Sequence, residues 1–155
     1  MIQVISDRLI VEKFIPTSTW ERDGHGQAHI NGDVPAQPGV YLFVIGGKIY
    51  YVGSAVSSLR SRMASYRRRQ NGGLPSRPVH IELSKALDEG KLVEVFTLVI
   101  PEPIEVGREG LPVDYAIGLE AGLIRTLNPP WNRRGSKLVL DEIDGGVAPE
   151  SSLSR

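Results

Sequence analysis

Two short runs of the sequence place a tyrosine close to a glycine, and they lie in the two arms of one expected hairpin. Gly39-Val40-Tyr41 opens the first arm, and Tyr51-Val52-Gly53 closes the second. A hairpin that only packs requires neither these phenols nor a glycine at the end of each arm. A phenol hydroxyl both donates and accepts hydrogen bonds. The tyrosines are therefore candidates for chemistry as well as for packing.

Further along the chain, other side chains suit the hydrolysis of a phosphodiester bond. That reaction needs positive charge near the phosphate, a group that takes a proton from water, and a proton for the leaving oxygen. Arg62 and Tyr66 lie one turn apart on a predicted helix. Glu120 stands on a later, mostly apolar helix, where a carboxylate is costly to bury unless it binds something. Asn132 follows the double proline that ends this helix.

The arginines are unevenly distributed. The formal net charge is zero, with 18 basic and 18 acidic residues, yet residues 60–77 contain no acidic residue. Arginine presents a planar fork of donors that suits phosphate. We therefore expect this segment to bind nucleic acid, although a solvated helix face is the alternative. Besides Arg62, its arginines are Arg60, Arg67, Arg68, Arg69 and Arg77.

The composition excludes several classes of protein. The chain has 155 residues, 41% hydrophobic and 23% charged, as is typical of one globular domain. It has no cysteine, which excludes disulfides, thiolate zinc sites and cysteine nucleophiles. No stretch approaches the roughly 20 apolar residues of a membrane span, and the charged N-terminal residues are unlike a signal peptide. We expect a cytoplasmic protein with no membrane partner.

Sequence periodicity predicts the elements that must position these residues. Runs rich in β-formers on both sides of Gly46-Gly47 predict a hairpin. Leu59, Met63 and Tyr66 share one face of a predicted helix that ends near residues 71–73. Also predicted are helices over 79–89 and 113–127, a third strand over 92–100, a loop over 101–112 and an edge strand over 137–140. The expected fold is α+β, with a small, mainly antiparallel three-stranded sheet flanked by helices.

We expect three parts along the chain. Residues 1–38 form an N-terminal arm or subdomain, which we predict to be irregular from residue 16 onward because glycine, proline and polar residues are scattered there. His25 and His29 lie four apart, but the glycines around them disfavour a helical metal site. Residues 39–141 form the catalytic domain. Residues 142–155 are rich in Gly, Pro, Ser and acids and are expected to be disordered.

The register of the hairpin decides which tyrosines share a site. A two-residue turn at Gly46-Gly47 would place Tyr41 and Tyr51 on opposite faces of the sheet, because side chains alternate along a strand. Both tyrosines reach one face only if the turn has three or five residues or if one strand contains a bulge. We predict one of these arrangements. With a tight turn and no bulge, Tyr50 would accompany Tyr41 instead.

In order and spacing, these residues resemble the motifs of the GIY-YIG nuclease family. Gly39-Val40-Tyr41 and Tyr51-Val52-Gly53 look like the two halves of the motif that names the family. Arg62 resembles the family's helix arginine, and Glu120 resembles its metal-binding glutamate. Asn132 resembles the asparagine that closes the last motif.

The resemblance covers about residues 39–134 and implies a divalent-metal-dependent DNA endonuclease, free-standing or of the restriction type. It implies one Mg²⁺ or Mn²⁺ ion per active site, held by Glu120 together with water and phosphate oxygens. Tyr41 would act as the general base or relay protons to it, with nearby cations favouring its phenolate. Arg62 would stabilise the charge that develops on the phosphate.

The remaining family positions imply supporting roles. Tyr51 and Tyr66 would orient the phosphate or the water, and Asn132 would hold the local backbone and the surroundings of Glu120. Some members carry histidine where Tyr66 stands, and tyrosine is the weaker base. His80 on the next predicted helix is a candidate substitute, although a surface or capping histidine is the commoner case.

Two other functions stay open. One is a non-catalytic module of the same fold that binds nucleic acid or protein, and the other is a subunit active only within a larger assembly. The intact motif residues favour the enzyme. Cutting both strands would require a homodimer or two encounters with the DNA. RNA stays open as a substrate.

Overall fold

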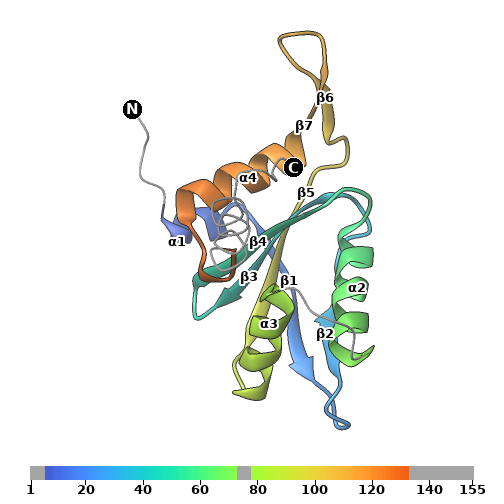
Figure 1. Ribbon diagram of the computed structural model, residues 1–155, viewed down its shortest axis with the longest axis vertical. Coiled ribbons are helices and arrows are strands. Elements are labelled where there is room, and N and C mark those ends of the chain that lie inside the picture. Colours follow the sequence, from blue (N-terminus) through green and yellow to red (C-terminus); the bar gives the residue numbers. More distant parts are fainter. Residues whose placement is uncertain (1–5, 73–77, 133–155) are drawn as a thin grey trace, which may run out of the picture.

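The structure of the protein is a computed structural model that describes residues 6–72 and 78–132 (Figure 1). The first half contains α1 (Asp7–Val11), β1 (Ile15–Arg22), β2 (Ala28–Gly32), β3 (Gly39–Ile45), β4 (Lys48–Ala55) and α2 (Leu59–Gly72). The second half contains α3 (Pro78–Asp88), β5 (Val93–Val99), β6 (Ile104–Val106), β7 (Pro112–Asp114) and α4 (Tyr115–Leu127). The expected α+β class with an antiparallel sheet and flanking helices is confirmed.

The main sheet has five strands rather than the expected three, in the order β2-β1-β5-β3-β4. The neighbouring strands β5, β3 and β4 are the three predicted strands. The two additional strands come from residues 15–32, which we had predicted to be irregular. That prediction was wrong because β1 pairs with β5, nearly 80 positions later in the sequence. Trp20, on β1, is 1% exposed and anchors the added strands to the core.

The β3–β4 hairpin combines a two-residue turn with a bulge. Gly46 and Gly47 form the turn with φ of 60° and 80°, a backbone conformation that favours glycine. The pairing runs regularly from the turn to Val44 opposite Ile49 and then shifts, so that Phe43 lies opposite Tyr51. The extra residue at this shift reverses the alternation of β4. Of the arrangements that we predicted, the bulge is the one that occurs, and Tyr41 and Tyr51 lie on the same face.

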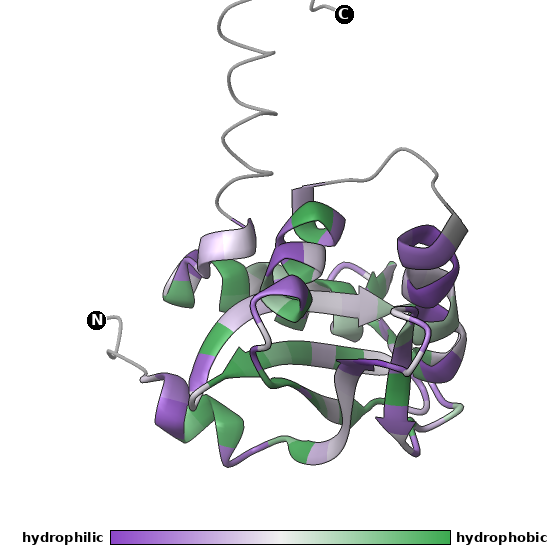
Figure 2. Ribbon diagram, turned by 90° about the horizontal axis from the view of Figure 1, so that it is seen from below, coloured by the Kyte–Doolittle hydropathy of each residue, from purple (hydrophilic) through white to green (hydrophobic). Residues whose placement is uncertain are grey.

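Two hydrophobic cores cover the two faces of the sheet. On one face, α2 and α3 pack against side chains that include Phe43, Val95 and Trp20. On the other face, α1 and α4 pack against aliphatic side chains that include Val40 and Leu42. Figure 2 shows hydrophobic residues along the strands, whereas the arginine-rich helix α2 is largely hydrophilic.

The helices begin and end for local reasons. Leu59, Met63 and Tyr66 are at most 4% exposed and form the predicted stripe of α2. Asp114 caps the start of α4, where its Oδ1 accepts a hydrogen bond from the Ile117 amide at 2.9 Å. Asn128 ends α4 in the left-handed conformation, with φ of 49°. Both α2 and α4 agree closely with their predicted ranges.

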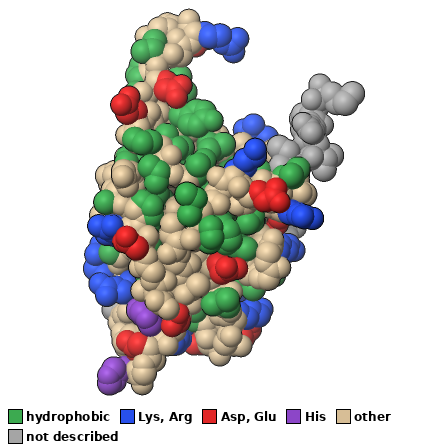
Figure 3. All heavy atoms as spheres, turned by 180° about the vertical axis from the view of Figure 1, so that it is seen from behind, with side chains coloured by type: hydrophobic (Ala, Val, Ile, Leu, Met, Phe, Trp, Pro, Cys, Tyr) green, Lys and Arg blue, Asp and Glu red, His purple; other side chains and the backbone are tan. Residues whose placement is uncertain are grey.

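Residues 101–112 were predicted to be a loop, but β6 and β7 pair there in a separate two-stranded sheet. This hairpin projects from the body of the molecule (Figure 3). Its exposed apolar residues include Ile104, Val106 and Val113. The short β-branched runs were hidden among glycine, proline and acidic residues.

Several other expectations concern particular segments. His25 lies in the turn before β2 and His29 lies on β2, so the pair is not helical, as expected. The expected strand at 137–140, the expected tail at 142–155 and Arg77 lie outside the described residues. Within the described ranges, no helix combines the length and the apolar character needed to cross a membrane.

Candidate active site

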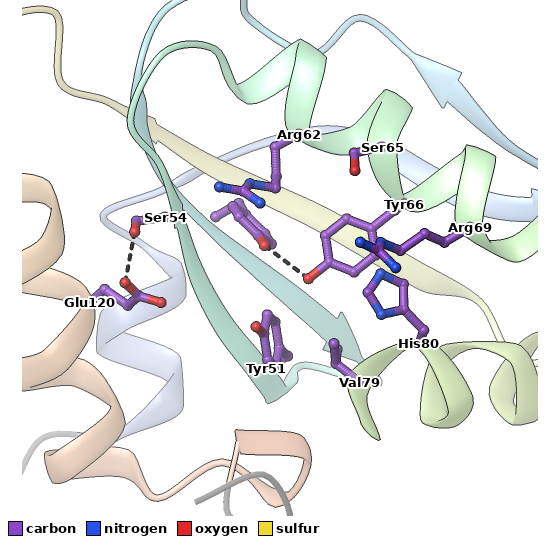
Figure 4. Close-up of a pocket in the computed structure, with 10 residues that line it drawn as sticks. Tyr51, Ser54, Arg62, Ser65, Tyr66, Arg69, Val79, His80 and Glu120 are labelled. Carbon is purple, nitrogen blue, oxygen red and sulfur yellow. Dashed lines mark hydrogen bonds between the residues drawn. The ribbon is translucent and has the colours of Figure 1, made fainter. Parts of the chain in front are cut away.

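A pocket of about 220 Å³ lies where α2, α3 and α4 meet β3 and the edge strand β4 (Figure 4). Five of the six predicted catalytic residues line it: Tyr41, Tyr51, Arg62, Tyr66 and Glu120. Ser54, Ser65, Arg69, Val79 and His80 complete the lining. The fold thus brings together side chains that lie far apart in the sequence.

Three phenols form the floor of the pocket. The hydroxyl oxygens of Tyr41 and Tyr66 lie 2.9 Å apart and share a buried hydrogen bond. Tyr51 lies close enough to Tyr66 to help raise the pKa of the Tyr66 phenol. The ring centroids of Tyr41 and Tyr51 are 6.1 Å apart. Tyr50 does not line this pocket and instead packs on Trp131, which confirms that Tyr51 is the partner of Tyr41.

Burial keeps Tyr41 and Tyr66 protonated. Burial raises the pKa of Tyr41, the nearby Tyr51 raises it further, and the hydrogen bond from Tyr66 and the charge of Arg62 lower it by less. The pKa of Tyr66 is likewise raised well above its ordinary value, mainly by burial. This direction is opposite to the expected phenolate, because desolvation outweighs the attraction of the neighbouring cation.

Each of the two motif glycines leaves room for a close neighbour. A Cβ at Gly53 would collide with the ring and hydroxyl of Tyr41, which lies across the backbone of β4. A Cβ at Gly39 would collide with the Leu98 carbonyl oxygen of the neighbouring strand. Gly53 is therefore needed for the position of the Tyr41 phenol.

Glu120 reaches the pocket from α4. Its Oε1 accepts a hydrogen bond from the Ser54 hydroxyl at 2.7 Å, which orients the carboxylate at the end of β4. The side chain points toward the phenols and Arg62 (Figure 4). Among the residues that the structure describes, no three His, Cys, Asp or Glu side chains gather as a metal cluster. One carboxylate among hydroxyl oxygens is a donor set that fits a cation which keeps most of its water, as Mg²⁺ does.

Asn132 does not line the pocket but holds its edge strand. Its Oδ1 accepts a hydrogen bond from the Val52 amide at 2.8 Å, and its Nδ2 donates to the Val52 carbonyl at 3.0 Å. Val52 lies on β4, the edge of the sheet, next to Tyr51 and Gly53. The Asn132 side chain thereby hydrogen-bonds the backbone of β4, the strand that carries the second motif.

The predicted nucleic-acid-binding arginines do not share one surface. Arg69 lines the pocket together with Arg62. Arg60 donates to the Val34 carbonyl at 2.9 Å and pairs with Asp33 at 3.2 Å. Arg60 and Arg67 line a separate hollow of about 410 Å³ between β2 and α2. The fourth described arginine, Arg68, is exposed on α2.

His80 is placed differently from the surface or capping histidine that we considered the commoner case. It is 6% exposed, lines the pocket, and stacks on Tyr66 with ring centroids 4.7 Å apart. Sequence reasoning also missed Ser54 and Ser65 in the lining. Ser65 lies three residues after Arg62, so the spacing along α2 would have placed it on the same face.

The fold has known structural relatives. A mutant of bacteriophage T4 EndoII superposes with a TM-score of 0.63 and 21% identity, covering 80% of this chain and 96% of that chain. Restriction endonuclease Hpy188I in complex with product DNA superposes with a TM-score of 0.51 and 19% identity, covering 96% of this chain and 86% of that chain. The GIY-YIG N-terminal endonuclease domain of UvrC from Thermotoga maritima, bound to magnesium, has a TM-score of 0.41 and 27% identity. The match covers 64% of this chain and 86% of that chain. No family model and no curated protein matches the sequence.

Proposed function

We propose that this chain, which has the fold of the GIY-YIG nucleases, is a divalent-metal-dependent endonuclease that hydrolyses phosphodiester bonds in DNA. One observation carries the proposal: Tyr41, Tyr51, Arg62, Tyr66 and Glu120 line a single pocket. Packing alone does not require an arginine and a carboxylate around three phenols, two of them buried. The likeness to endonucleases of the same fold supports this reading of the pocket.

Arg62 is the group that binds the scissile phosphate. Its side chain is exposed and lines the pocket opposite Glu120, so a strand of DNA can reach it from solvent (Figure 4). A guanidinium donates paired hydrogen bonds to phosphate oxygens and remains charged at all working pH values. It can therefore stabilise the negative charge that grows on the phosphate in the transition state.

The phenols orient the attacking water and the phosphate. Because burial keeps Tyr41 protonated, its hydroxyl works as a neutral hydrogen-bonding group that relays protons, the second of the two roles expected for it. Tyr66 holds the Tyr41 hydroxyl at 2.9 Å and fixes its direction. Tyr51 completes the same floor and contributes a third hydroxyl.

Glu120 is the metal ligand of the proposed site. Ser54 holds one of its carboxylate oxygens and so orients the other. When bound, one Mg²⁺ or Mn²⁺ ion supplies positive charge to the phosphate and acidifies water. Asn132 acts through the backbone, because its bonds to Val52 keep β4 and the neighbouring Tyr51 in register.

We infer a restriction-type role from the likeness to Hpy188I. Such a role requires two active sites acting on the two strands, in a homodimer or in successive encounters. DNA as the partner and a cytoplasmic location are part of this proposal.

A plasmid-nicking assay with Mg²⁺ tests the proposed function. Wild-type protein is expected to convert supercoiled plasmid into nicked or linear DNA, and both Glu120→Ala and Tyr41→Phe are expected to lose this activity. Tyr115→Phe is the matched control, because Tyr115 is 49% exposed at the start of α4 and does not line this pocket. Cleavage that survives Glu120→Ala, or no cleavage by the wild type, would overturn the proposal.

A further inference from the structure

The pocket has two chemically different ends. Glu120 and Ser54 lie at one end, with Arg62 and Tyr41 beside them (Figure 4). At the other end, the view shows the guanidinium of Arg69 next to the ring of His80. The proposed reaction uses the first end and assigns no task to the second.

The two arginines are too far apart along α2 to form one compact clamp. Arg62 and Arg69 are seven residues apart, which corresponds to two turns and about 10 Å along the helix axis. Both side chains project from the same face of the helix toward the pocket. Their guanidinium groups occupy separate positions along it (Figure 4). Two separated cations along one groove suit two successive phosphates of a strand.

The second end is built from constrained side chains. His80 is 6% exposed, and its ring is stacked on Tyr66 at 4.7 Å. The His80 carbonyl accepts a hydrogen bond from the Gln70 side chain at 2.6 Å, which ties the start of α3 to α2 beside Arg69. The position of the imidazole is therefore determined by both helices, and its ring is held against the pocket wall.

The chemistry of this end fits an anion. Arg69 offers only donors, Ser65 offers a hydroxyl, and an imidazole presents at least one N–H in any protonation state. Among the described residues that line the pocket, the only carboxylate is Glu120, which lies at the opposite end. A phosphate at the Arg69 end would therefore meet hydrogen-bond donors, whereas the carboxylate of the lining lies at the other end.

We propose that Ser65, Arg69 and His80 form a binding site for a second phosphate, that of the nucleotide next to the scissile bond on the same strand. The inference rests on the proposed nuclease function, because it takes the Glu120 end as the place of the scissile phosphate. The second site sets the direction and register of the strand before cleavage.

Binding of small nucleotides tests the second site. The probes are thymidine 3′,5′-bisphosphate and the two thymidine monophosphates, titrated into the full chain by calorimetry in buffer with Ca²⁺. The wild type is expected to bind the bisphosphate at least about tenfold more tightly than either monophosphate, as one added charge-assisted contact gives. Arg69→Ala and His80→Ala are each expected to remove this preference.

Controls separate the site from general charge and from misfolding. Lys85→Ala removes a positive charge from an exposed position of α3 outside the pocket and is expected to keep the preference. Arg69→Lys keeps the charge and should recover part of it, which a folding defect would not. Equal binding of bisphosphate and monophosphates by the wild type, or a preference that survives in both alanine variants, would overturn the second site.

The nicking assay distinguishes this failure from failure of the nuclease. A wild type that nicks plasmid but binds the bisphosphate no more tightly than the monophosphates retains the nuclease and loses the second site. If the wild type does not nick plasmid, yet prefers the bisphosphate and Arg69→Ala removes that preference, the second phosphate site is retained and the proposed nuclease function is rejected.

Discussion

Strand β3 has two faces that are buried equally well but held in different ways. Val40, Leu42 and Val44 face α1 and α4, in a core built of aliphatic side chains around Phe14 and Phe96. Tyr41 and Phe43 face α2 and α3, in a core where aromatic rings, two of them phenols, pack among aliphatic side chains. Each of these five residues is at most 2% exposed.

The two faces of β3 therefore make different contributions. The aliphatic face contributes to stability, and the phenol face also contributes to the proposed chemistry. The aliphatic face is stabilised by the area it removes from water, which has no direction. The phenol face buries hydroxyl groups, and each must point at a partner because an unpaired buried hydroxyl is costly. We therefore expect substitutions on the first face to change the free energy of unfolding, and substitutions around the second to change the reaction as well.

The largest expected effect is on the aliphatic face. Leu42→Ala removes a side chain that is fully buried between the sheet and α4 and leaves a cavity. The free energy of unfolding should fall by about 2–5 kcal/mol. Urea unfolding followed by circular dichroism measures this change. The nicking rate per folded molecule should stay near that of the wild type, and a stable variant without activity would break the comparison.

The next effect concerns the pocket that the phenol face forms. Arg62→Ala should lower the cleavage rate by about 10²–10³-fold, because it removes the charge that stabilises the transition state. The free energy of unfolding should change by less than about 0.5 kcal/mol, since Arg62 is exposed. Plasmid nicking and urea unfolding of the same preparation measure both. Arg125→Ala, at an exposed position near the end of α4, is the matched control.

A smaller effect tests the hydrogen bond inside the phenol face. Tyr66→Phe leaves the buried Tyr41 hydroxyl without the partner that now lies at 2.9 Å, and should cost about 1–3 kcal/mol of unfolding free energy. The double variant with Tyr41→Phe should cost less than the two single changes added together, because it removes both hydroxyls. Additive costs in this double-mutant cycle would show that the hydrogen bond contributes nothing.

The smallest effect at neutral pH is the contribution of the raised tyrosine pKa values. Below the ordinary pKa of 10.0, Tyr41 and Tyr66 are protonated in the folded and the unfolded chain. Above pH 10 the unfolded chain loses these protons while the folded chain keeps them, so stability falls as the pH rises. Each tyrosine contributes a slope of about 1.4 kcal/mol per pH unit. Thermal melts of Tyr66→Phe between pH 10 and 11 should show a shallower decline than those of the wild type.

The sequence predicted the hairpin, with either a longer turn or a bulge, because the geometry allowed few alternatives. If two phenols share one site and the turn consists of Gly46 and Gly47 alone, one arm must contain one extra residue. The bulge supplies that residue. The buried stripe of Leu59, Met63 and Tyr66 likewise allowed only a helix. Where a residue's neighbours in sequence determined its geometry, the prediction agreed with the structure.

Features that depend on distant pairing could not be predicted. β1 is polar and begins near Pro16, and it becomes a strand because it pairs with β5 on one side and β2 on the other. The site of His80 depends on how α3 packs against α2, which no local pattern encodes. The protonation of Tyr41 depends on its burial in the core on the α2 and α3 face of the sheet, so its motif position alone suggested the opposite direction.

Asn132 has a consequence beyond the pocket. An edge strand offers unpaired N–H and C=O groups that can recruit a strand from another molecule. By bonding both groups of Val52, the Asn132 amide occupies one position on the outer edge of β4. The same side chain that keeps the second motif in register thus limits self-association, so that loss of this one amide favours aggregation as well as inactivity.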